Sequence, residues 1–564
     1  MRHLLKSGAL QLALAALLIT PAYAQGPTYD LILSQGTVYD GSGKLPVITD
    51  IGITGQRITG IGDLSEADTD NRVSVRGYAV SPGFINMLSW ASEALLIDGR
   101  SQSDIRQGVT LEIFGEGRSM GPLSPSMRDA MRARQTEARF DIPWTTLGEY
   151  LEHLVAKGVS PNVGSFVGAT TVRIHELGYA NREPTPTELS RMQKLVSHAM
   201  QEGAFGVGSS LIYAPAFYAD TDELVALMQA AARHNGAYIS HLRSEGNQIE
   251  ASIDELIEIA RRTDAPAQIY HLKIAGKKNW PKYERVIAKI ESARSAGIDV
   301  STNMYTYTAG STGLDAAMPP WSQEGGYAAW AERLQDPDLR PKIAKEMAVD
   351  ANDWENLLLA AGPANTLLVG FRNPELRVFT GKTLAEVAQF LGKSPIETAI
   401  DLVIQDGSRV QVVYFLMSED HVKRNIALPW MSFGSDAGSY TNAGVFLNRS
   451  THPRAYGNFA RLLGKYVRDE KVIPLTEAIH KLTELPAKFL HLADRGKLAV
   501  GHFADIAIFD PANIRDVATY EDPHQYAQGM VHVLVNGEWV LHNGAHTGAL
   551  PGQVVRGPGW VVAP

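Results

Sequence analysis

The alternation of strand-like and helix-like segments through the middle of the chain is the feature that most limits its fold. Apolar runs typical of buried strands occur at residues 205–208, 237–241, 268–271 and 430–434, and helical patterns lie between them, as at 221–234 and 247–262. Such alternation favours a parallel α/β architecture, and a (β/α)8 barrel is the natural candidate over about 400 residues. A doubly wound sheet is the alternative, but no glycine-rich phosphate loop follows the early strands.

Both ends of the chain carry a different pattern, in which short alternating strands are separated by glycine turns. Near the N-terminus the strand-like runs are residues 30–33, 50–53 and 57–61, and near the C-terminus they are 505–510 and 531–534. This pattern predicts sheet rather than helix. We therefore expect the two ends to fold together as one small β-sandwich domain.

The 564 residues are too many for one small core, so several units are expected. We predict a barrel over residues 81–490 and a β domain built from residues 25–80 and 491–564. A segment at about 315–362, rich in Trp, Pro and charge, is predicted to be an insertion that serves as a lid.

Residues 1–24 have the pattern of a cleavable secretory signal. A basic start is followed by an apolar stretch at residues 8–19 and by Ala22-Tyr23-Ala24, a small-x-small site. A transmembrane anchor is the alternative, but a membrane span needs about 20 apolar residues. We expect cleavage after Ala24 and a periplasmic or secreted mature protein; because no Cys follows that site, no lipid anchor is expected.

Composition excludes several functions. The net charge of −9, without a run of basic residues, argues against nucleic acid or an anionic membrane as partner. The chain has no cysteine, so disulfides, thiolate nucleophiles and cysteine metal ligands are excluded.

Three polar residues follow strand-like runs, where a barrel carries its catalytic groups. His241 and His271 each close such a run, and Asp436 comes shortly after another. Imidazole nitrogen and carboxylate oxygen are zinc ligands, and a carboxylate beside the metal can take a proton from water and pass it to a leaving amine. Taken by themselves, the three residues could equally be hydrogen-bonded residues of the core or rim.

Several motifs in order along the mature chain resemble one family. They are Ser81-Pro82-Gly83-Phe84-Ile85-Asn86, Gln107-Gly108-Val109-Thr110, Ser209-Ser210-Leu211-Ile212-Tyr213-Ala214-Pro215, Ser240-His241-Leu242-Arg243-Ser244-Glu245-Gly246, His271-Leu272-Lys273, Tyr305-Thr306-Tyr307-Thr308-Ala309-Gly310-Ser311-Thr312, Gly434-Ser435-Asp436 and Thr451-His452-Pro453-Arg454. Together they resemble the N-acyl-D-amino-acid deacylase (D-aminoacylase) branch of the amidohydrolase superfamily. That resemblance also implies a (β/α)8 barrel with a small β domain built from both chain ends.

The resemblance implies roles for individual residues. His241 and His271 match metal-binding histidines, and Asp436 matches the catalytic acid/base. The positions that match groups binding the substrate's carboxylate or supporting its carbonyl are Lys273, Tyr305, Ser311 and Arg454. Arg and Lys suit a carboxylate, and a Tyr hydroxyl can donate to an oxyanion. Ion pairs for the two cations and ordinary loop packing for Tyr305 and Ser311 are the alternatives.

Two departures from the family pattern bear on the metal. Leu88 and Trp90 stand where most superfamily members carry His-x-His, so one of two metal positions is expected to be lost. The usual Asn-Cys-Gly is replaced by Gly115-Glu116-Gly117, which puts a carboxylate where relatives have a cysteine ligand. We predict that Glu116, His241 and His271 hold one zinc per chain, with water as fourth ligand; a pairing of Glu116 with Arg118 is the alternative.

These observations predict a metal-dependent amidohydrolase acting on linear, non-peptide C–N amide bonds. The expected reaction is zinc-dependent hydrolysis of N-acyl amino acids, of D configuration by resemblance, to a carboxylic acid and a free amino acid. A D-amino-acid dipeptidase or other amide hydrolase is the nearest alternative. A non-catalytic small-molecule-binding protein on the same barrel is the alternative from another class.

Overall fold

The structure is a computed structural model that describes residues 28–135 and 137–561. The expected signal at residues 1–24 lies outside these described residues. Within the described ranges, no helix combines the length and the apolar character that crossing a membrane requires.

Eight parallel strands form a closed barrel within the described residues, counting β8 and β9 as one strand interrupted at Phe166. In order they are β6 (Phe84–Asn86), β7 (Val109–Phe114), β8 (Asn162–Ser165) with β9 (Val167–Gly168), β10 (Gly206–Ser210), β11 (Ala237–His241), β12 (Ala267–Ile269), β13 (Val300–Met304) and β17 (Met431–Phe433). The backbone N–H of Met87 donates to the carbonyl of Phe433 at 3.2 Å, which joins the last strand to the first. The carboxyl ends of all eight strands therefore face one end of the barrel.

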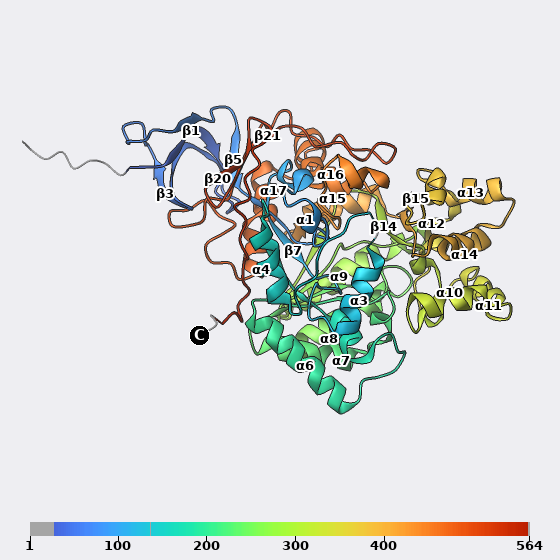
Figure 1. The fold of residues 1–564 in the computed structure, drawn as a ribbon. Helices are drawn as coiled ribbons and strands as arrows, with labels where there is room; N and C mark the ends of the chain where they lie inside the picture. The colour runs from blue at the N-terminus through green and yellow to red at the C-terminus, as the bar shows by residue number, and fades with distance from the viewer. Residues whose placement is uncertain (1–27, 136, 562–564) are drawn as a thin grey trace, which may run out of the picture.

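Helices pack around the outside of the barrel (Figure 1). They include α4 (Leu147–Lys157), α5 (Ala169–Leu177), α6 (Pro186–Gln201), α7 (Thr221–Ala232), α8 (Ile249–Thr263), α9 (Tyr283–Ser295), α15 (Glu419–Ala427), α16 (Arg454–Arg461) and α17 (Leu475–Leu482). The helix α8 shows the cause: Ile253, Leu256 and Ile259 recur at helical spacing and are buried, while none of its charged residues is fully buried. The helices predicted at 221–234 and 247–262 are confirmed as α7 and α8.

Strands from both chain ends form a second sheet. Its members are β1 (Leu31–Val38), β2 (Val47–Thr54), β3 (Arg57–Gly62), β4 (Arg72–Ser74), β5 (Ala79–Pro82), β18 (Ile506–Phe509), β19 (Met530–Val535), β20 (Glu538–His542) and β21 (Ala545–His546). The N-terminal β5 pairs antiparallel with the C-terminal β18, so the two ends share one sheet and one apolar core. Figure 1 shows this domain beside the barrel, with blue and red strands together.

A third unit interrupts the barrel between β13 and β17. It contains the antiparallel strands β14 (Ala309–Gly313), β15 (Thr366–Gly370) and β16 (Gln411–Phe415), and the helices α10 (Tyr327–Gln335), α11 (Leu339–Met347), α12 (Leu357–Ala361), α13 (Leu384–Leu391) and α14 (Pro395–Asp406). These elements enclose their own apolar core. The unit runs from β14 to β16 and is longer than the predicted 315–362, because β15 and β16 look locally like barrel strands but pair antiparallel in a separate sheet.

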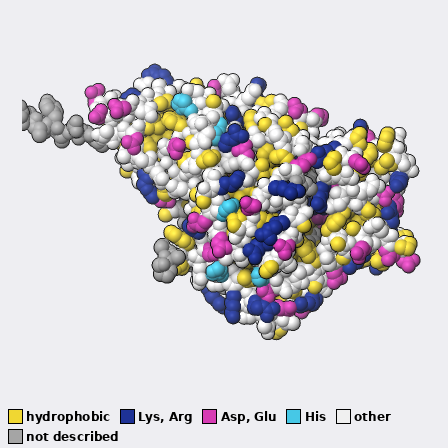
Figure 2. Space-filling view, in the orientation of Figure 1, with side chains coloured by type: hydrophobic (Ala, Val, Ile, Leu, Met, Phe, Trp, Pro, Cys, Tyr) yellow, Lys and Arg dark blue, Asp and Glu magenta, His cyan; other side chains and the backbone are white. Residues whose placement is uncertain are grey.

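The predicted fold class, a (β/α)8 barrel with a β domain from both ends and an inserted segment, is confirmed by this architecture. Figure 2 shows acidic and basic side chains interspersed over the visible face, in keeping with the mixed composition.

Candidate metal centre and active site

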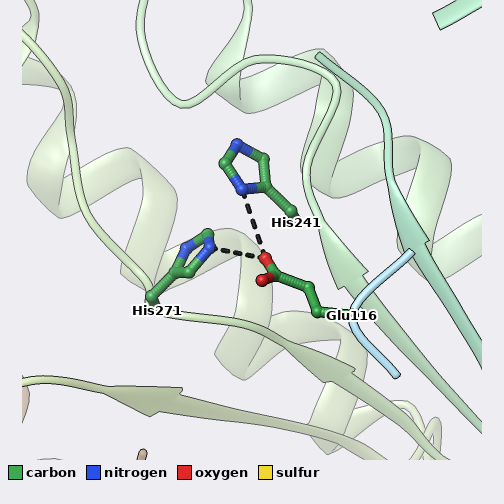
Figure 3. Close-up of side chains that lie close together, drawn as sticks. All are labelled: Glu116, His241 and His271. Carbon is green, nitrogen blue, oxygen red and sulfur yellow. Dashed lines mark hydrogen bonds and ion pairs between the residues drawn. The ribbon is translucent and has the colours of Figure 1, made fainter. Parts of the chain in front are cut away.

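Three side chains from three barrel strands meet at the carboxyl end of the barrel. Glu116 follows β7, His241 is the last residue of β11, and His271 follows β12 (Figure 3). Oε1 of Glu116 lies 3.3 Å from Nδ1 of His241 and 2.9 Å from Nε2 of His271. All three side chains are buried. The structure therefore brings together the three residues predicted to be metal ligands.

The backbone around Glu116 is fixed by its two glycine neighbours. Gly115 and Gly117 have φ angles of 105° and 70°, in the region that side chains disfavour. A Cβ on Gly115 would lie 2.2 Å from the carbonyl oxygen of Phe166, and one on Gly117 would lie 2.5 Å from Oγ of Ser210. The Gly-Glu-Gly sequence thus lets the chain pass between neighbouring strands and aim one carboxylate at the imidazoles.

The geometry of the three ligand atoms fits a divalent ion. Two bonds of about 2.0–2.1 Å at a tetrahedral angle separate their ligand atoms by about 3.3 Å. Oε1 of Glu116 lies 3.3 Å and 2.9 Å from the two imidazole nitrogens, close to that separation. A carboxylate with two imidazoles is also a donor set that zinc accepts. Among the described residues, this is the one group of three or more such side chains that could hold an ion.

The charges at the centre are coupled. Burial opposes ionisation of Glu116, but the imidazole of His271 and then that of His241 outweigh it and hold the pKa of Glu116 below its ordinary value. For His271, burial and the charge of Lys273 lower the pKa, yet the carboxylates of Glu245 and Glu116 raise it to about 9. The attraction between the imidazole of His271 and the carboxylate of Glu116 therefore contributes to both pKa shifts.

Asp436 lies at the same end of the barrel, after β17. Its φ angle of 48° is unusual for a residue other than glycine, and its backbone N–H donates to the carbonyl of Leu88 at 2.9 Å. Strained conformations of this kind are concentrated at functional sites. Burial raises the pKa of Asp436, partly offset by the positive charge of Arg454, whose Nη1 lies 2.8 Å from Oδ2 of Asp436.

The residues predicted to bind substrate surround this group. The guanidinium of Arg454 stacks over the Tyr305 ring at 4.3 Å, and the Tyr305 and His271 rings are 6.3 Å apart. The carbonyl oxygen of Ser311 accepts a hydrogen bond of 3.4 Å from Arg454, while the Ser311 hydroxyl donates to the carbonyl of Val412. Arg454 therefore contacts both Tyr305 and Ser311, and of these residues Tyr305 lies beside the predicted metal ligand His271.

Comparison with known proteins agrees with this arrangement. The family model described as the amidohydrolase family matches residues 161–541. The chain belongs to the amidohydrolase family.

Individual relatives cover nearly the whole chain. The D-aminoacylase of Alcaligenes xylosoxydans xylosoxydans is 34% identical over 531 residues, which cover 93% of this chain and 97% of the relative. A solved D-aminoacylase, studied for one-metal activation and second-metal attenuation of its binuclear metal centre, is 31% identical with a TM-score of 0.78, covering 94% of this chain and 100% of that one. The N-acyl-D-glutamate deacylase of Bordetella bronchiseptica, solved with zinc and a phosphonate mimic of the tetrahedral intermediate, is 26% identical with a TM-score of 0.77 over the same shares.

Glu245 is a further site residue of this amidohydrolase. It lies in a motif that carries the family resemblance, but it is not among the residues to which that resemblance assigns a role. Its Oε1 lies 2.9 Å from Nδ1 of His271, and its carboxylate forms a buried ion pair with Lys273. A carboxylate behind a ligating imidazole fixes the orientation and tautomer of the ring. The position of Glu245 four residues after His241, within that motif, was the available sequence signal.

Lys273, predicted to bind the substrate's carboxylate, contacts Glu245 and His271 in this amidohydrolase. Its Nζ pairs with Glu245 and lies 2.7 Å from Nδ1 of His271, and only 7% of the residue is exposed. Burial raises the pKa of Glu245, but Lys273 and then the two imidazoles outweigh it and lower that pKa. Its contacts here are those of the ion-pair alternative, with Lys273 holding Glu245 ionised behind His271.

Asn86 links the first and last barrel strands beneath the site. Its Oδ1 accepts a hydrogen bond of 2.9 Å from the backbone N–H of Ser435, and its side-chain amide donates to Glu112 at 3.0 Å. The residue is fully buried. Because Ser435 precedes Asp436, Asn86 holds the loop that presents the predicted acid/base.

Leu88 and Trp90 bring no metal ligand to the centre. Leu88 is buried among apolar residues, and the indole of Trp90 is a hydrogen-bond donor only. The loss of the metal position that the resemblance assigns to His-x-His stays a prediction.

Proposed function

We propose that this amidohydrolase hydrolyses the amide bond of N-acyl-D-amino acids and uses one zinc ion held by Glu116, His241 and His271. The observation that carries the proposal is the meeting of these three side chains beside Asp436 and Arg454. Relatives named for deacylation of N-acyl-D-amino acids, one solved with zinc, support the substrate class and the metal.

The zinc site and Asp436 would carry out different parts of the proposed hydrolysis. A zinc ion held at the centre would polarise the attacking water and the scissile carbonyl. Asp436, whose pKa is raised by burial, is suited to take a proton from that water and return it to the leaving nitrogen.

Arg454 and Tyr305 would hold the substrate. Arg454 can donate two hydrogen bonds to the carboxylate of the substrate's amino-acid part, in a bidentate pair. Tyr305 donates to the thioether of Met417 at 3.4 Å, a weak acceptor that a developing oxyanion would displace.

Export to the periplasm or outside the cell is part of the proposal, supported by the pattern of residues 1–24. Free N-acyl amino acids outside the cytoplasm would then be the substrates.

The test combines metal content with substrate turnover. The purified mature protein is expected to bind about one zinc per chain and to release free amine from N-acyl-D-amino acids faster than from their L enantiomers. Turnover of dipeptides in place of N-acyl amino acids would favour the dipeptidase alternative. A protein that binds no metal and turns over no substrate would favour the binding-protein alternative and contradict the proposal.

A further inference from the structure

Trp90 makes a direct contact with the proposed metal ligand Glu116. Its indole Nε1 donates a hydrogen bond of 2.9 Å to Oε2 of Glu116. Although 40% of Trp90 is exposed, the carboxylate that it reaches is only 5% exposed. The two oxygens of Glu116 therefore have separate partners, with Oε1 facing both imidazoles (Figure 3) and Oε2 bound to the indole.

The backbone of Trp90 is fixed to the loop that carries Asp436. Its N–H donates to the carbonyl of Ala437 at 2.9 Å, and Ser89 forms a parallel bridge with the same Ala437. The N–H of Asp436 in turn donates to the carbonyl of Leu88. The short segment from Leu88 to Trp90 thus holds Asp436 through its backbone and Glu116 through one side chain.

We infer that Trp90 is a positioning residue, which orients Glu116 as a ligand for a single ion and fixes its distance from Asp436. The inference rests on the proposed metal site. The hydrogen bond leaves Oε1 free to face the ion, because rotation of the carboxylate would break the contact with the indole.

The same contact opposes a second ion. In the common bridging mode a carboxylate offers one oxygen to each ion, but Oε2 of Glu116 already accepts from an indole N–H that cannot be a ligand. A cation beside Oε2 would also face the positive edge of the N–H dipole. Glu116 therefore supplies the ligand, and Trp90 limits the centre to one ion.

The test measures zinc affinity by chelator competition on metal-free protein. Trp90→Phe keeps an aromatic ring and removes the donor, and it is expected to weaken zinc binding about 10- to 100-fold, as loss of outer-shell hydrogen bonds does. Trp90→Gln restores an N–H donor and should recover part of the affinity. Trp560→Phe, at an exposed tryptophan that packs on Arg556, is the matched control and should bind zinc as the wild type does.

Two further measurements distinguish loss of positioning by Trp90 from damage to the fold. The thermal midpoint of metal-free Trp90→Phe should equal that of the wild type, and saturating zinc should restore most of its turnover. Unchanged zinc affinity, or weaker affinity with a lowered midpoint and no recovery in excess zinc, would overturn the inference. A wild-type protein that binds no zinc would instead refute the proposed function, and the inference with it.

Discussion

Arg454 and Asp436 form a nearly buried ion pair, with Nη1 of the arginine 2.8 Å from Oδ2 of the aspartate and side chains that are 3% and 13% exposed. The residue predicted to hold the substrate's carboxylate is thus bound to the predicted acid/base. Because substrate would draw Arg454 toward its own carboxylate, binding would weaken this pair and raise the proton affinity of Asp436.

Replacing Arg454 should therefore change both substrate binding and pH dependence. Burial raises the pKa of Asp436 and Arg454 lowers it, so Arg454→Gln should raise that pKa further. Asp436 would then be ionised only at higher pH, and the acid limb of kcat/KM should move to higher pH. KM should rise by about 10-fold or more through loss of a charged hydrogen bond. Arg454→Lys, which keeps the charge but not the bidentate geometry, should raise KM with a smaller shift of the acid limb; an unmoved limb in both variants would remove Arg454 from this role.

Asp436→Asn tests the acid/base directly. The amide cannot accept the proton of the attacking water, so turnover should fall by about 100- to 10,000-fold. Zinc content should not change, because Asp436 is outside the three-residue ligand group. Turnover close to that of the wild type, measured with metal content in the same preparation, would remove Asp436 from the mechanism.

Glu116→Ala removes one of three proposed ligands. Zinc affinity should fall by more than the roughly 100-fold limit of outer-shell changes, with loss of turnover at ordinary zinc concentrations. Metal analysis after dialysis measures this. Unaltered zinc stoichiometry in the variant would show that Glu116 is not a ligand and would favour its role as a hydrogen-bond acceptor alone.

Glu245→Gln tests the carboxylate behind His271. The change removes the negative partner of the imidazole and of Lys273, so zinc affinity should fall about 10- to 100-fold. The matched control is Glu250→Gln, which breaks a surface ion pair with Arg285 and should leave zinc affinity unchanged. Equal affinities in the two variants would mean that Glu245 does not tune the metal ligand.

Glu355, from the inserted unit, should make stability depend on pH. Its Oε2 accepts from the backbone N–H of Glu245 at 3.1 Å, while its Oε1 is buried without a partner. Burial, followed by the charge of Glu245, raises its pKa from 4.5 to about 8. The folded protein therefore binds a proton that the unfolded chain has lost between these values, and the stabilisation that this proton provides is lost as pH rises through about 8.

Glu355→Gln should remove this dependence, because an amide keeps the acceptor and has no charge to bury. Thermal midpoints recorded across that pH range should fall less in the variant than in the wild type, and the variant should be the more stable above pH 8. Glu332→Gln, at an exposed carboxyl on α10, should follow the wild type. Parallel midpoint curves for all three proteins would mean that Glu355 is ionised without cost.

The extent of the inserted unit shows where sequence patterns stop being informative. Strands β15 and β16 have the apolar composition of barrel strands, and only the antiparallel pairing of β16 with both β15 and β14 separates them from the barrel. Pairing partners are chosen by long-range packing, so a local pattern predicts that a strand exists but not which sheet it joins.

The sequence by itself determined which residue types stand at the ends of strands, because the end of an apolar run is a local feature. His241, His271 and Asp436 were found in this way, and the Leu and Trp at the His-x-His position were visible without a structure. Only the tertiary structure decided how these groups are joined. Glu116 contacts His271, from which it is separated by 155 residues in the sequence, and its second carboxylate oxygen accepts a hydrogen bond from Trp90. Glu245 lies behind His271 and forms an ion pair with Lys273. The closure of the barrel sets these distances, because it brings the carboxyl ends of strands far apart in the chain to within a few ångströms of one another.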